Sequence, residues 1–105
     1  MNYSKAVRKK FKQLATLAYE KELRAELKIL SEKFKLWDEG KIDTWTLEEA
    51  IHNFHQGPSK KLYGRYTDLS PDMIVPYALA KGLISLDDIP SEIADEIKIK
   101  AETFK

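Results

Sequence analysis

The sequence has 105 residues, of which 43% are hydrophobic and 33% are charged, and it contains no cysteine. This length and composition are typical of one folded, soluble domain rather than a disordered chain. The lack of cysteine excludes disulfides, thiol catalysis and cysteine-based metal sites. No run of 18 apolar residues and no signal-peptide core are present. We therefore expect a single cytoplasmic helical domain over residues 1–105, with no separate linker and no membrane association.

Charge is unevenly distributed, although the net charge is only +1. Residues 1–37 hold ten Lys or Arg against four Asp or Glu, whereas residues 68–105 hold four against eight. The densest basic cluster consists of Lys5, Arg8, Lys9, Lys10 and Lys12. Such a gradient is typical of a nucleic-acid- or membrane-facing end, of a basic first helix near an acidic last one, or of a solvated face. We favour the last two interpretations, because charged residues are mostly exposed.

The first predicted element is an unusually long helix from about residue 5 to residue 37, with Ser4 as its N-cap and Gly40 as its left-handed stop. No Gly, Pro or Asn interrupts residues 14–36, so we expect an unbroken helix about 50 Å long. Two apolar stripes follow helical spacing and point about 150° apart. They are Val7, Phe11, Leu14 and Ala18 in the first half, and Leu23, Leu27, Leu30, Phe34 and Trp37 in the second.

A helix of this length extends beyond a compact 105-residue globule, which measures about 33 Å across. We expect a compact bundle of shorter helices packed on its second half. The face formed by Val7, Phe11, Leu14 and Ala18 is then the predicted interface of a homo-oligomer, most simply a dimer. The alternative is a monomer in which the last helix covers this face with Ile93, Ile97 and Phe104.

Shorter helices follow in chain order and complete an all-α fold of about five helices. The second begins near Thr44 or Thr46, with Thr46 to Glu49 as a capping box, and ends at Gly57-Pro58. A short third helix runs from Ser59 to about residue 66. The fourth starts at Ser70-Pro71 and closes at Gly82, and its internal Pro76 should kink or shorten it. A capped turn from Ser85 to Asp88 then leads into a final helix that ends near residue 103.

Both histidines of the chain lie on the predicted second helix. Glu48, His52 and His55 fall within about 60° of one another on the flank of its apolar stripe. Such a trio can share a metal or perform acid–base chemistry near neutral pH. The spacing lacks the Glu of a zinc-protease helix, and a di-iron bundle would need a second His motif. We therefore expect no metal and no cofactor, and we keep Glu48, His52 and His55 as catalytic candidates beside a structural role.

The turn after these histidines is a candidate anion site. If Ser59 caps a new helix, its free backbone N–H groups point at the same corner as Lys60 and Lys61, and Arg65 can join them. A phosphate or a nucleic-acid backbone would suit this arrangement. The alternative is a plain helix–turn–helix junction with solvated lysines.

No motif of a characterised family is present, so the functional hypotheses come from the residues alone. We expect an interaction or regulatory module that self-associates through the first helix and also accepts protein partners, rather than an enzyme. The alternative is a phosphate- or nucleic-acid-directed binding protein or hydrolase centred on His52, His55, Lys60 and Lys61. The alternative needs these side chains in one cleft, whereas an interaction module needs an exposed apolar patch elsewhere.

Overall fold

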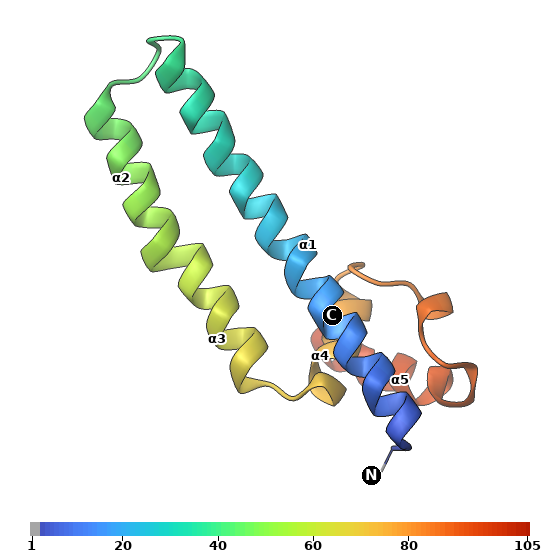
Figure 1. Cartoon of the computed structure of the whole chain (residues 1–105). Coiled ribbons are helices and arrows are strands. Elements are labelled where there is room, and N and C mark those ends of the chain that lie inside the picture. The colour runs from blue at the N-terminus through green and yellow to red at the C-terminus, as the bar shows by residue number, and fades with distance from the viewer. Residues whose placement is uncertain (1–2) are drawn as a thin grey trace.

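The computed structural model of the chain describes residues 3–105 and is shown in Figure 1. These residues form helices and connecting turns only, so the all-α prediction with a long N-terminal helix is confirmed. No helix among residues 3–105 combines the length and the apolar character needed to cross a lipid bilayer. The elements are α1 (Lys5–Asp38), α2 (Thr44–Phe54), the π-helical turn η1 (His55–Ser59), α3 (Lys60–Asp68), α4 (Pro71–Ala80), α5 (Ala94–Ala101) and the short 3₁₀ turns η2 (Leu86–Asp88), η3 (Ser91–Ile93) and η4 (Glu102–Phe104).

Helix α1 is continuous along its whole length, as its sequence predicts. The Ser4 side chain accepts a hydrogen bond from the Val7 backbone N–H at 3.1 Å, and Gly40 ends the helix with a φ of 74°. The helix sets the longest dimension of the molecule, which measures 54 × 24 × 23 Å. The radius of gyration is 17.4 Å, well above the value of about 13 Å for a compact domain of this length.

The core lies on the first half of α1, where α4 and α5 pack (Figure 1). Shorter helices do pack on the second half of α1, as predicted. The largest buried cluster nevertheless forms on the first half, because α4 is apolar around most of its circumference and needs cover on several sides. The predicted interface residues Val7, Phe11, Leu14 and Ala18 are at most 6% exposed. They pack in one cluster with Val75, Ala78, Ile84, Ile89 and Ile97. The same chain thus covers this face, as the monomer alternative predicts, and a second subunit does not.

The second half of α1 packs against α2 and α3, which run back alongside it as one long arm (Figure 1). The helix does not stop at Gly57-Pro58, contrary to prediction. Proline lacks an N–H and collides with the carbonyl four residues earlier, and one π-helical turn removes both problems without breaking the helix. Ser59 accordingly has helical dihedral angles of −61° and −48°, and its side chain makes no capping bond.

Helix α2 begins at Thr44, one of the two predicted starts, but its cap differs from the prediction. Asp43 is the N-cap, and its Oδ1 accepts a hydrogen bond from the Thr46 backbone N–H at 2.7 Å. Thr46 is therefore inside the first turn and does not cap it. The predicted turn at Ser85 is confirmed, since the Ser85 N–H donates to Asp88 Oδ2 at 2.8 Å.

Candidate functional site

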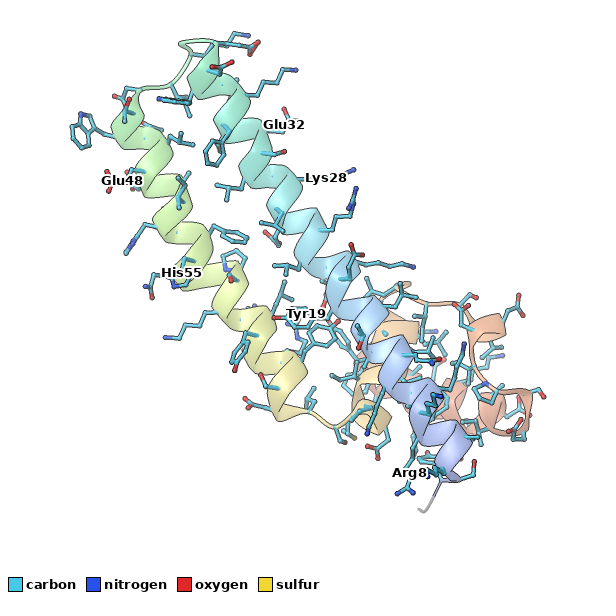
Figure 2. The ribbon with its side chains drawn as sticks, in the orientation of Figure 1. Arg8, Tyr19, Lys28, Glu32, Glu48 and His55 are labelled. Carbon is cyan, nitrogen blue, oxygen red and sulfur yellow. The ribbon has the colours of Figure 1, made fainter. Side chains whose placement is uncertain are left out.

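The predicted His52–His55 site is not assembled in the structure. Glu48, His52 and His55 are all exposed, and among residues 3–105 no ion pair or hydrogen bond joins them. Figure 2 labels Glu48 and His55 on successive parts of the arm. No group of three or more metal-binding side chains forms among these residues.

The predicted anion site is divided between two sides of the arm. Ser59 and Lys60 line a groove of about 420 Å³ together with His55. Lys61 and Arg65 instead line a separate cavity of about 570 Å³ against α1. Because the helix continues through Ser59, it has no free N-terminal N–H groups at that point. The four residues therefore do not converge on one anion.

The densest polar cluster is one that sequence reasoning missed, and it joins α1, α3 and α4. Glu22 accepts hydrogen bonds from the hydroxyls of Tyr66 at 2.6 Å and Tyr77 at 2.8 Å. Arg65 Nη1 lies 3.4 Å from Glu22 Oε2 and donates to the Tyr77 hydroxyl at 2.9 Å. Tyr66 also stacks on Tyr19, with ring centroids 4.6 Å apart and planes 3° from parallel.

This cluster, here called the Glu22 network, consists of Glu22, Arg65, Tyr66 and Tyr77. Burial raises the pKa of Tyr66 and Tyr77, and the hydrogen bonds and negative charge of Glu22 raise both pKa values further. Both phenols consequently remain protonated donors at neutral pH, and each carboxylate oxygen of Glu22 accepts from one of them. The network therefore fixes three helices to one another rather than activating a nucleophile. The change of apolar face between residues 19 and 23 was the signal in the sequence that could have located it.

A second feature lies in the hairpin formed by α1 and α2, where apolar side chains are left half-exposed. Leu27, Phe34 and Ile51 are 45%, 43% and 39% exposed. At about 100° per residue, Leu27 and Phe34 lie within about 20° of each other on α1. We call these three residues the hairpin patch.

The hairpin seam has two sides. One side forms a groove of about 460 Å³ whose lining mixes polar side chains, among them Glu26, Lys33, Glu49 and Asn53, with apolar ones, among them Ile29, Leu30 and Phe54. By helical phase, Leu27 and Phe34 point at least about 100° away from Ile29 and Lys33, and Ile51 points about 160° away from Glu49 and Asn53. In an antiparallel hairpin this places the hairpin patch on the opposite side of the seam.

The structure thus presents a polar network that ties helices together and an apolar patch that faces solvent on the hairpin. The second arrangement is the one expected of an interaction module. Comparison of the chain with protein-family models, with curated proteins and with solved structures gives no match.

Proposed function

We propose that this protein is an interaction module that pairs with a second copy of itself through the hairpin patch, forming a four-helix bundle. The observation that supports the proposal is the half-exposed state of Leu27, Phe34 and Ile51 on one side of the seam. Two antiparallel helices can bury apolar side chains only along the line where they meet. A second hairpin related by two-fold symmetry would cover the open side, as in four-helix bundles.

The size of the surface is compatible with a reversible dimer. The hairpin half of α1, residues 20–38, extends about 28 Å at 1.5 Å per residue, and two helices side by side are about 20 Å wide. The face therefore measures about 600 Å² per copy, toward the lower end of stable interfaces. We expect a dimer with a dissociation constant in the micromolar range rather than an obligate one.

The charges along the hairpin half of α1 do not oppose a second copy. Residues 20–38 hold five Lys or Arg against five Asp or Glu. Figure 2 shows one of each, Lys28 and Glu32, on the outer side of α1. The α1 halves of two copies can therefore approach without net charge repulsion.

Sedimentation equilibrium over low to high micromolar concentrations tests the proposal. Wild type should show a mass that rises toward that of a dimer, and Leu27→Asp should stay monomeric because it places a carboxylate in the apolar seam. Ile29→Asp is the matched control, since Ile29 is 59% exposed and lines the groove on the other side of the same hairpin. It should associate like wild type. A wild-type mass that remains monomeric throughout, or equal loss of association in both variants, would contradict the proposal.

A further inference from the structure

The exposed face of the first half of α1 carries cations that the fold does not use. Lys5, Arg8, Lys9 and Lys12 are all exposed, and none forms an ion pair with residues 3–105. At about 100° per residue they point away from the buried Val7–Ala18 stripe. We call these four residues the basic track. Figure 2 labels Arg8 near the start of this track.

The acidic C-terminal segment does not neutralise the basic track. The backbone N–H of Ser85 lowers the pKa of the Asp88 carboxyl, and the nearby Lys10 and Lys21 lower it further. Lys10 thus belongs to the side of α1 that faces the C-terminal segment. In α5, Glu96 is engaged by Lys100 at 3.4 Å and by the Tyr3 hydroxyl at 3.2 Å. The interpretation of a basic helix paired with an acidic one therefore does not extend to the track.

The track leads to an aromatic groove. Tyr19 lies seven residues after Lys12 and within about 20° of it in helical phase. Tyr19 lines the 420 Å³ groove together with His55, Lys60 and Tyr63. Its ring is held in place because it stacks on Tyr66, whose hydroxyl is bound by Glu22. Tyr63 is 63% exposed on the opposite wall, so it leaves a ring face available.

We propose that the basic track and the Tyr19–Tyr63 groove together bind single-stranded nucleic acid. From Lys5 to Tyr19 the surface extends about 21 Å, the length of about six stacked nucleotides at 3.4 Å each. Cations along one edge neutralise phosphates, and exposed aromatic rings stack on bases whatever their sequence. This role is separate from the proposed self-association, since it uses none of the residues of the hairpin patch.

Two other polyanions fit the surface less well. A membrane-binding helix inserts an apolar face beside its cations. Here that face is Val7, Phe11, Leu14 and Ala18, which α4 and α5 cover. A nucleic-acid duplex keeps its bases paired and stacked, so it would use the track but leave the aromatic groove empty.

Fluorescence anisotropy with a labelled oligothymidine of about 12 nucleotides tests the inference. Protein is added until binding saturates in low salt, and the affinity is then measured at rising salt concentrations. Four phosphate contacts predict a slope of about −2.8 for log affinity against log salt. Arg8→Ala/Lys12→Ala should reduce the slope by about 1.4. Lys28→Ala/Lys98→Ala removes equal charge from exposed positions outside the track and should change the slope little.

The groove is tested separately at Tyr63. Tyr63→Ala should weaken binding by about 5- to 150-fold through loss of base stacking, whereas Tyr63→Phe should retain affinity because the ring remains. Circular dichroism checks that each variant keeps its helix content. No saturable binding by wild type, equal effects of the two double variants, or equal affinity for a duplex of the same length would each overturn the inference.

Discussion

Replacing Glu22 with Gln is the most direct perturbation of the contacts that hold α1, α3 and α4 together. Two phenols donate to the same carboxylate at 2.6 and 2.8 Å, and a hydrogen bond to a charged group contributes about 1.5–3 kcal/mol. The Arg65 contact at 3.4 Å is longer, and its side chain is 26% exposed, so solvent screening limits it to less than about 1 kcal/mol. Glutamine keeps one acceptor oxygen but loses the charge and the second acceptor. We therefore expect Glu22→Gln to lower the free energy of unfolding by about 2–3 kcal/mol.

Urea unfolding followed by far-ultraviolet circular dichroism measures this loss, and thermal unfolding should show a fall of about 10 °C or more. Glu20→Gln is the matched control. Glu20 contacts Arg24 at 3.9 Å on the exposed side of the same helix, so its replacement should cost about 0.5 kcal/mol or less. If the two variants have equal stability, the Glu22 network does not fix the helices and our reasoning about it is wrong.

The same network sets a dependence on alkaline pH. The pKa values of Tyr66 and Tyr77 are raised in the folded state, mainly by burial, whereas an unfolded tyrosine titrates near pH 10. The folded chain therefore holds more protons than the unfolded chain above about pH 10, and the free energy of unfolding must fall as pH rises from there. Tyr66→Phe removes one titrating group and should show a shallower fall in urea titrations between pH 9 and about 11.

Three further predictions test the local assignments. Asp43→Ala should lower the urea midpoint more than Thr46→Ala, because Asp43 supplies the capping oxygen; equal midpoints would place the cap elsewhere. Gly82→Ala should cost about 1–2 kcal/mol because φ is 73° there. Gly64→Ala should stabilise by about 0.5–1 kcal/mol, because Gly64 lies inside a helix and an added Cβ would meet only Asp68 Oδ2, at 3.9 Å; calorimetry showing the same sign for both would refute this. Phe11→Ala should lower the free energy of unfolding in urea by about 3–5 kcal/mol at every protein concentration, since Phe11 is 1% exposed within one chain. A loss that vanishes on dilution would restore the interpretation of Phe11 as an interface residue.

Features that depend on a few neighbouring residues could be predicted from the sequence. The uninterrupted α1, the Ser4 cap and the left-handed Gly40 all follow from local backbone chemistry. The helix end predicted at Gly57-Pro58 is wrong, because this pair usually follows the last turn of a helix but here lies inside one. Packing of the arm along α1 kept the helix intact, and a π-helical turn absorbed the proline.

Contacts between distant residues could not be predicted. The apolar stripe that includes Phe11 requires a cover, but the sequence alone does not say whether α4 and α5 or another subunit supplies it. The Glu22 network joins Glu22 to residues 43 to 55 positions away. The change of apolar face marks its place on α1, but no spacing pattern gives the partners. The predicted anion site is not formed because the helix continues through Gly57-Pro58. Adjacent residues of one helix differ by about 100°, so Ser59 and Lys60 line a different side of the helix from Lys61.

The single seam of the hairpin has a consequence for how the molecule opens. Side chains near its tip, such as Phe34 and Trp37, are 43% and 40% exposed, whereas Phe11 and Ala18 at the other end of α1 are 1% and 0% exposed. Helices open locally where few apolar contacts hold them, so amide protons near the tip should exchange with solvent faster than those in the core. One continuous helix thus has slowly exchanging amides at its core end and faster exchanging amides toward its tip. A binding event at the tip would therefore be recorded as slowed exchange there, with the core end of the same helix unchanged.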